Sequence, residues 1–356
     1  MLSASSPTPI LALNAGSSSL KFGLYLMGPL SCEELYSGAD ESAGTPDAAP
    51  VARIAELLRT RGLPAPLAIG HRIVHGGLHC RAHTMIDPAV MQNLEAAAAF
   101  APLHVPPALA LVHAASDLFP GVPQVACLDT AFHTDMPAVA RSLPIPAEVR
   151  ALGVERYGFH GLSCESIVRQ LGATVPPRLV IAHLGHGASV TAVARGRSVD
   201  TSMGLTPSGG VVMSTRCGDI DPGVLAYLVR ELGYDAARLE RFIDHRSGML
   251  GISGLSGDMR ELRAAAAINP AARLAIEMFC YSVLKQIAAM VAVLGGVDRL
   301  VFTGGIGEND APSRAMICDG LGALGIHSAS ALVTVMATRE AEQTARHAYE
   351  LAVAAA

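Results

Sequence analysis

The chain has few charged residues: 16% of its 356 residues are Asp, Glu, Lys or Arg, against about 25% in an average soluble protein. Hydrophobic residues make up 51%, which indicates much buried surface, either in a large core or at a subunit interface. A length of 356 residues exceeds that of one ordinary core and predicts two domains.

Long apolar runs without charge are also lacking. The most apolar stretch, residues 276–295, contains Glu277, Lys285 and Gln286, which membrane-spanning helices avoid, and we interpret it as a buried helix. The first ten residues contain no basic region and no long apolar run, which argues against a secretory signal.

No C-x-x-C pair occurs among the seven scattered cysteines. This usage argues against disulfides and a structural zinc site, and it predicts reduced thiols in the cytoplasm. The net charge is −5 and the sequence contains no basic run. This argues against binding of nucleic acid, which needs clustered Lys and Arg residues.

Two segments share one pattern. Residues 9–26 and 178–195 each contain an apolar β-type run, a turn rich in small residues, and an alternating strand. A third glycine loop, 303–309, follows an apolar run at 300–302. The spacing suggests an internal duplication, although two unrelated hairpins remain an alternative because the halves share little sequence identity.

The rest of the chain predicts a mixed α/β protein with helical periodicity in seven segments. These segments are Val51–Arg61, Pro88–Phe100, Pro106–Leu118, Ser163–Leu171, Pro222–Leu232, Met259–Ala267 and Pro270–Leu294. A closing helix is expected between Thr338 and Ala356, and residues 37–50 read as a surface loop.

Two loops could bind phosphate. Residues 14–21, NAGSSSLK, offer backbone amides, three hydroxyls and a cation, and successive N–H groups can form an anion nest. Residues 183–189, HLGHGAS, repeat this plan with two histidines. Neither loop is a Walker motif, and a Ser-rich turn is often only a turn.

Four further residues could act on an anionic substrate. Arg72 and Arg216 lie among glycine and apolar residues, which favours a cleft, where a guanidinium fork matches carboxylate or phosphoryl oxygens. Asp129 follows an apolar run and is expected at a strand end, where α/β folds bind ligands. His160 lies between an aromatic residue and a glycine. For each residue an ordinary structural role is the alternative.

Taken together, these segments resemble the acetate kinase family, within the superfamily of acetate and sugar kinases, Hsp70 and actin. The resemblance runs from Leu13 to His347 and keeps the family's order. The matching stretches are NAGSSSLK (14–21), GHRIVHGG (70–77), APLH (101–104), LDTAFH (128–133), RYGFHG (156–161), HLGHGAS (183–189), DTSMGLTP (200–207), TRCGDIDPG (215–223), SGDMR (256–260) and GGIGEN (304–309).

The resemblance implies roles for individual residues. The catalytic residues would be Asp129, Arg72, Arg216 and His160, with His160 and Arg216 stabilising the transition state and His104 a further site histidine. The acid would be held by Arg72 and an apolar pocket of Val74, Leu103, Phe159 and Pro207. ATP would be bound by Ser17, Ser19, Lys21, His183, Gly185, Gly187, Asp258, Met259, Arg260, Gly304, Gly305, Ile306, Gly307, Glu308 and Asn309. Asn14 and Glu340 would be associated with Mg²⁺, for which Mn²⁺ can substitute.

The chain departs from the family pattern at several positions. His186 replaces an asparagine, Cys217 a serine, and GLSC, with Cys164, replaces the usual segment after GFH. The segment TPSGG (206–210) replaces TPLEG. Near the C-terminus, Glu340 corresponds to the family's metal-associated glutamate, but only this one residue and its position in the sequence support the match.

The resemblance implies an α/β fold of two actin-like (ribonuclease H-like) domains. Residues 1–131 with 341–356 would form the first domain, and residues 132–340 a second, adenosine-binding and dimer-forming domain, with ATP in the cleft between them. The implied reaction is reversible, direct in-line phosphoryl transfer from ATP to acetate in a cytoplasmic homodimer. Propionate or butyrate as the acceptor is an alternative, and a nucleotide-binding module without transfer activity is a more remote one.

Overall fold

The computed structural model describes residues 7–15, 20–40, 49–102 and 104–353. The chain divides into two compact units. The first unit contains residues 1–134, 161–166 and 339–356, and the second contains residues 135–160 and 167–338. The domain boundaries predicted from the sequence are 1–131 with 341–356 for the first domain and 132–340 for the second. They remain a prediction.

The first unit is built on a six-stranded sheet with the order β3-β2-β1-β4-β6-β5. Its strands are β1 (Thr8–Ala15), β2 (Leu20–Met27), β3 (Cys32–Asp40), β4 (Ala68–Ile73), β5 (Thr84–Met85) and β6 (Gln124–Leu128). Strands β1, β2 and β3 pair antiparallel, whereas β1, β4 and β6 are parallel. The carboxyl ends of β1, β4 and β6 therefore meet at one edge of the sheet.

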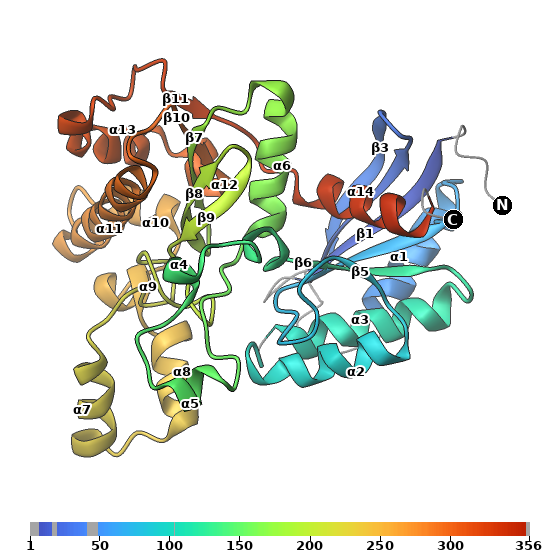
Figure 1. Ribbon diagram of the computed structural model, residues 1–356, viewed down its shortest axis with the longest axis horizontal. Coiled ribbons are helices and arrows are strands. Elements are labelled where there is room, and N and C mark those ends of the chain that lie inside the picture. The colour runs from blue at the N-terminus through green and yellow to red at the C-terminus, as the bar shows by residue number, and fades with distance from the viewer. Residues whose placement is uncertain (1–6, 16–19, 41–48, 103, 354–356) are drawn as a thin grey trace. The chain divides into compact units, whose positions relative to one another are not determined.

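Helices cover both faces of this sheet. Alternate residues of a strand point to opposite faces, so Leu11 and Leu13 of β1 pack with α1 (Ala49–Thr60) and α3 (Val105–Leu118). Ile10 and Ala12 pack instead against the C-terminal helix α14 (Glu340–Ala352), which is red in Figure 1 and lies against the blue strands. The end of the chain thus completes the core of the first unit.

The second unit repeats the strand plan of the first. Its sheet has the order β11-β10-β7-β8-β9. The strands are β7 (Arg178–Leu184), β8 (Ala188–Ala194), β9 (Arg197–Thr201), β10 (Arg299–Thr303) and β11 (Val333–Val335). As in the first unit, three consecutive strands pair antiparallel and two later strands add in parallel. This shared topology supports the duplication suggested by the two hairpins.

The remaining helices connect and cover these strands. They are α2 (Pro88–Ala96), α4 (Ala138–Arg141), α5 (Ala147–Arg150), α6 (Gly161–Leu171), α7 (Pro222–Leu232), α8 (Ala236–His245), α9 (Gly248–Ser253), α10 (Met259–Ala265), α11 (Pro270–Leu294), α12 (Gly304–Asn309) and α13 (Ala311–Gly320). Short 3-10 helices occur at Ala97–Ala99, Ala131–His133, Gly172–Thr174 and Gly322–Leu324.

Helix α11 is buried along one side only. Phe279, Val283 and Ile287 lie in the core of the second unit, where the helix packs on β7 and β8. Leu274, Met278 and Tyr281 are 49%, 40% and 64% exposed. By length and composition, this is one helix of the described residues that could cross a membrane. The predicted buried helix thus packs in the core along one side and exposes apolar residues along the other.

Buried His71 makes the stability of the first unit depend on pH. Burial lowers the pKa of His71 from 6.5 to about 4, and its Nε2 atom lies 2.6 Å from the Gln124 side-chain amide. Because the unfolded chain binds a proton near pH 6.5 and the folded chain does not, stability falls as pH drops from 6.5 to 4. The loss reaches at most about 3 kcal/mol.

We therefore expect His71→Asn to lower the urea midpoint at pH 7. Between pH 7 and pH 5, the midpoint should decrease less in this variant than in the wild type. The exposed His113→Asn of α3 controls for the loss of a histidine. Urea unfolding followed by circular dichroism at both pH values measures this effect. An equally steep pH dependence in His71→Asn and the wild type would contradict it.

Candidate active site

In the first unit, four polar residues gather at the carboxyl ends of the parallel strands. Asn14 is near the end of β1, Arg72 is in β4, Asp129 directly follows β6, and Glu340 begins α14. This is the edge at which α/β sheets bind ligands. The four residues come from segments up to 326 positions apart, so only the fold brings them together.

Arg72 is the centre of this group. Its guanidinium forms an ion pair with Asp129 and donates to Asn14 Oδ1 at 3.1 Å. Asn14 Nδ2 in turn donates to Glu340 Oε2 at 3.4 Å. The side chains of Arg72 and Asp129 are only 16% and 1% exposed. Such a buried, charge-assisted network holds its members in fixed positions.

Among these four residues, two carboxylates accompany one guanidinium. Burial raises the pKa of Asp129, against the lowering effect of Arg72 beside it, and the nearby Glu340 carboxylate raises it further. Asp129 Oδ1 is buried and has no hydrogen-bond partner among the described residues. Carboxylate and amide oxygens are the ligands that magnesium accepts. The residues present therefore fit a divalent cation.

Glu342, two residues further along α14, is the alternative to Glu340 as the metal-associated glutamate. Its carboxylate lies 3.4 Å from Arg339 Nη1 and 3.5 Å from Arg346 Nη2. Glu342 thus has two arginine partners, whereas Glu340 reaches Asn14. This difference favours Glu340 over Glu342 as the residue associated with a metal.

In the second unit, polar residues surround the glycine loop between β7 and β8. His183 lies near the end of β7, and its ring stacks on that of His160 with the centroids 4.2 Å apart. His160 Nδ1 lies 3.0 Å from Ser189 Oγ of β8. A Cβ atom on Gly187 would lie 3.2 Å from His160 Nε2 and 3.3 Å from Arg216 Nη1. The loop, a histidine and an arginine therefore converge on one point.

A cavity of about 630 Å³ lies beside this loop. It is lined by Gly185, His186, Ser214, Thr215, Gly257, Asp258, Met259, Arg260, Gly305, Ile306, Asn309 and Asp310. Three separate segments predicted to bind adenosine or phosphate thus meet around one space of ligand size. Ser214 and Thr215 were not predicted as site residues, although they directly precede Arg216.

His186 was noted only as a departure from the family pattern, yet it lines this cavity. Burial and the neighbouring Arg216 lower the pKa of His186. The histidine that replaces the family's asparagine is thus favoured in its neutral form, which can both donate and accept a hydrogen bond.

Some residues predicted to bind ATP or the acid do not line this cavity or are exposed. The Glu308 carboxylate accepts hydrogen bonds from Gly304 N and Thr338 N, each at 2.9 Å, and the described residues that line the cavity do not include it. Arg260 lies at the cavity and pairs with Asp258, but its side chain is 91% exposed. Lys21 is an exposed residue of β2 that pairs in register with Asn14. Ser17, Ser19 and Leu103 lie outside the described residues.

The residues predicted to form the acyl pocket are divided between the two units. Val74 is a buried residue of the first unit. Phe159 is buried in the second unit, where Pro207 O accepts a hydrogen bond from Arg216 Nη1 at 3.3 Å. His104 directly precedes α3 in the first unit. The pocket itself remains a prediction.

A second cluster, not predicted from the sequence, contains His83, Glu165 and His347 in the first unit. Both rings contact the Glu165 carboxylate, at 3.1 Å and 2.7 Å, and they stack with centroids 3.8 Å apart. His83 Nδ1 accepts a hydrogen bond from Leu128 N–H at 3.0 Å, so the proton of the neutral ring is on the nitrogen that faces Glu165.

Two further observations argue against a cation in this cluster. Although burial opposes it, Glu165 and Glu350 raise the pKa of His347, while the two histidines lower that of Glu165 to about 2. The His83 nitrogen that faces Glu165 carries the proton and offers no lone pair to a metal, and nearly parallel rings do not aim their lone pairs at one point. The contact between Glu165 and His347 ties α6 to α14.

The repeated five-strand plan, with a polar site at the carboxyl ends of its strands, is that of two actin-like, ribonuclease H-like units. Residues 61–345 match the model of the acetokinase family. The chain belongs to this family.

Individual relatives agree with this assignment. The chain is 44% identical to an acetate kinase of Deinococcus radiodurans over 89% of its length and 86% of that protein. Its structure matches a crystal structure of Porphyromonas gingivalis acetate kinase with a TM-score of 0.86 and 32% identity, covering 97% of this chain and 100% of the other. A propionate kinase from Francisella tularensis matches with a TM-score of 0.86 and 35% identity, over the same shares of the two chains.

Proposed function

We propose that this protein reversibly transfers the terminal phosphoryl group of ATP to the carboxylate of acetate, giving acetyl phosphate and ADP. The observation that carries the proposal is the convergence of Arg216, His160 and the Gly187 loop on one point beside a cavity of nucleotide size. Family membership and the relatives named acetate kinase support the choice of substrates.

The reaction requires no strong base. Acetate is already ionised at pH 7, so one carboxylate oxygen attacks the terminal phosphorus while the bond from that phosphorus to the bridging oxygen breaks. The bridging oxygen leaves on ADP with the bonding electron pair. Catalysis then depends on alignment and on neutralising charge. Domain closure would exclude water and suppress ATP hydrolysis.

The first unit would handle the acid and the metal. Arg72 would anchor the acetate carboxylate, and Asp129 holds the Arg72 fork in place through the buried ion pair. Asn14 and Glu340, with the unpartnered Oδ1 of Asp129, would hold magnesium. When bound, the metal neutralises charge on the phosphate oxygens.

The second unit would handle the nucleotide and the transferring group. The cavity would accept adenosine, and His183 and the glycines of its loop would approach the phosphates. When the Ser189 hydroxyl donates to His160 Nδ1, the Nε2 atom carries the proton and can donate to a phosphoryl oxygen. Arg216 would add its fork to the same oxygens.

The proposal is tested by supplying ATP and a divalent metal with formate, acetate, propionate or butyrate. We expect hydroxylamine-trappable acyl phosphate and equimolar ADP, with acetate the best acceptor. ATP binding without acyl phosphate from any of the four acids would instead support a nucleotide-binding module without transfer activity.

The carry-over of the metal role to Glu340 is tested separately. Because its carboxylate contacts Asn14 whereas Glu342 is paired with arginines, Glu340→Ala should raise the magnesium concentration needed for half-maximal activity much more than the KM for acetate. Glu342→Ala is the matched control two residues along the same helix. A magnesium phenotype in Glu342→Ala alone would show that the role belongs to Glu342.

Propionate is the alternative acceptor, and the structural match to a propionate kinase favours considering it. An apolar pocket separates acids that differ by one methylene by only about 1–3 kcal/mol, so propionate should follow acetate within about 10–200-fold. Butyrate should be poor.

Val74→Ala removes two carbons from the proposed wall of the acyl pocket. It should raise kcat/KM for propionate relative to acetate. Val74 is only 5% exposed, so a thermal melt must accompany the kinetics. A lower melting temperature with an unchanged acid ratio would make Val74 ordinary core.

A homodimer is part of the proposal. Leu274, Met278 and Tyr281 recur at helical spacing on the exposed side of α11, and apolar stripes of this kind mark interfaces. Size-exclusion chromatography with light scattering should give a dimer, and Tyr281→Asp should weaken it. A cytoplasmic location is supported by the seven free cysteines.

A further inference from the structure

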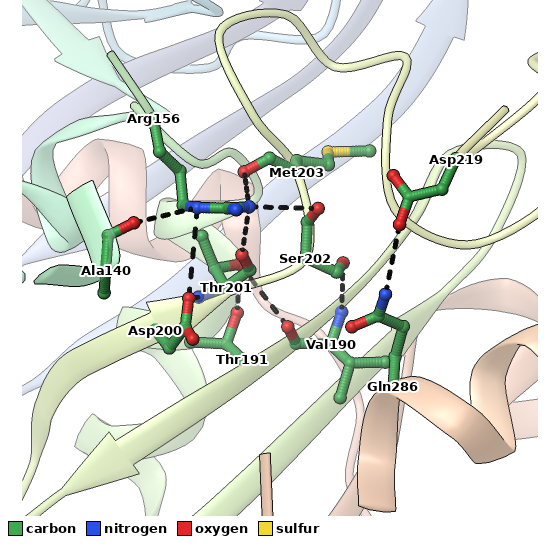
Figure 2. Close-up of polar contacts among 10 residues, drawn as sticks. All are labelled: Ala140, Arg156, Val190, Thr191, Asp200, Thr201, Ser202, Met203, Asp219 and Gln286. Atoms are coloured by element: carbon green, nitrogen blue, oxygen red, sulfur yellow. Dashed lines mark hydrogen bonds and ion pairs between the residues drawn. The ribbon is translucent and has the colours of Figure 1, made fainter. Parts of the chain in front are cut away.

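Arg156 joins two segments of the second unit through backbone oxygens. Its Nε atom donates to Ala140 O at 3.0 Å, and its Nη1 atom donates to Thr201 O at 2.9 Å. The same Nη1 atom lies 3.3 Å from Met203 O and 3.4 Å from Ser202 O. Figure 2 shows the planar group between Ala140 on one side and Thr201, Ser202 and Met203 on the other, with Asp200 below it. One side chain thus serves four backbone acceptors.

The backbone beside Arg156 is attached to the same place. Tyr157 N and Gly158 N both donate to Gly204 O, at 3.0 Å and 3.3 Å, and Arg156 N donates to Arg141 O at 2.8 Å. The segment 156–158 is therefore held on the chain that follows β9 by its backbone and by the Arg156 side chain together.

His160 lies two residues beyond this attachment in a strained conformation. Its φ of 60° is left-handed, which costs an L-residue without glycine's freedom about 1–2 kcal/mol and persists only where the surroundings impose it. His160 is 8% exposed, and its ring is held between Ser189 of β8 and His183 of β7.

The attachment point and the partner of His160 belong to one rigid piece. Ser202 N donates to Val190 O at 2.9 Å, and Val190 N donates to Ser202 Oγ at 3.0 Å. The hydroxyls of Thr191 and Thr201 lie 2.9 Å apart, and Figure 2 shows these links beside Arg156. Since Val190 adjoins Ser189, Arg156 and His160 are both fixed to the start of β8.

We propose that Arg156 is a positioning residue for His160, which holds the backbone of 156–160 so that the His160 ring meets the transferring phosphoryl group. The inference rests on the proposed function for its kinetic test. A lysine keeps the charge of Arg156 but cannot reach carbonyls on two segments from one planar group. A shift of about 1 Å at a reacting group can cost up to about 100-fold in rate.

The test is a double-mutant cycle of Arg156→Lys and His160→Ala, with acyl phosphate measured from radiolabelled ATP. We expect Arg156→Lys to lower kcat by about tenfold or more with KM for ATP little changed, and to have almost no further effect on kcat when His160 is already alanine. An equal loss in both backgrounds, or no loss in either, would overturn the proposal. Arg178→Lys, which also removes a fork from an aspartate and a backbone carbonyl of this unit, is the control.

A second measurement does not depend on activity. The ring resonance of His160, assigned by its loss in His160→Ala, should shift and broaden in Arg156→Lys with ADP bound, whereas that of His71 in the first unit should not. Absence of transfer by the wild type would refute the proposed function alone, whereas an unmoved His160 resonance would refute the positioning role alone. Arg156→Gln gives the same readout if the lysine variant does not fold.

Discussion

Asp129→Asn is expected to lower kcat by about 100- to 1,000-fold, the range seen when one preorganised electrostatic group is removed from a reaction site. The substitution keeps the size of the side chain but removes its negative charge, and the one oxygen that remains cannot serve both Arg72 and a cation. It also leaves the Arg72 charge uncompensated, so the melting temperature should fall, because breaking a buried pair costs about 3–5 kcal/mol.

Asp298→Asn is the matched control, since the Asp298 carboxylate also pairs with an arginine, Arg178, but is 29% exposed and belongs to the second unit. It should retain wild-type kcat. To separate chemistry from stability, kcat must be measured well below the melting temperature of Asp129→Asn. Activity within a few-fold of wild type in folded Asp129→Asn would remove Asp129 from the site.

Arg216→Lys and Arg72→Lys should each reduce kcat/KM at least about tenfold, equal to about 1.4 kcal/mol of transition-state binding. Each keeps its positive charge and loses the planar fork. Arg216 converges with His160 on Gly187 in the second unit, whereas Arg72 is paired with Asp129 in the first. The two substitutions should therefore reduce kcat/KM through different groups of residues.

The control is again Arg178→Lys, which should keep wild-type kinetics. We further expect Arg72→Lys to raise the KM for acetate and Arg216→Lys to act mainly on kcat. Wild-type kcat/KM in both lysine variants would exclude the two forks from transition-state binding.

Much of the fold is readable from local patterns. The expected helices at Pro222–Leu232 and Pro270–Leu294 are confirmed with the same bounds, because Asp221 and Asn269 cap them and proline occupies the first helical position. The fold class is also confirmed, since both hairpins begin sheets in which three antiparallel strands are followed by two parallel ones.

Other elements carried too little local signal. Helices α4, α5, α8, α9 and α13 were not predicted, and α12 was predicted as a glycine loop. Helix α9 is only six residues long and contains two glycines, and α13 follows α12 after a single residue. The predicted helix Pro88–Phe100 changes at Ala97 into a 3-10 turn. The spacing of apolar residues does not distinguish these two kinds of helix.

For the candidate site, the sequence supplied residues but not their partners. The motif of Asp129 placed it at a strand end, whereas its pairing with Arg72 depends on β4 and β6 being neighbours. Arg156 carries no motif signal for its carbonyl contacts, because backbone acceptors leave no trace in the side-chain pattern. The cluster of His83, Glu165 and His347 joins segments up to 264 residues apart (347 − 83), and only the tertiary structure reveals it.

Phosphoryl transfer to the acid itself is tested most directly with acetate labelled by ¹⁸O in its carboxylate. The labelled acid, ATP and magnesium are incubated with the enzyme, and phosphorus NMR follows the products. Direct attack by the carboxylate predicts acetyl phosphate whose phosphorus signal carries the isotope shift of an ¹⁸O bridge, formed in step with ADP. ADP accompanied only by unlabelled inorganic phosphate would mean transfer to water and would contradict the proposed function.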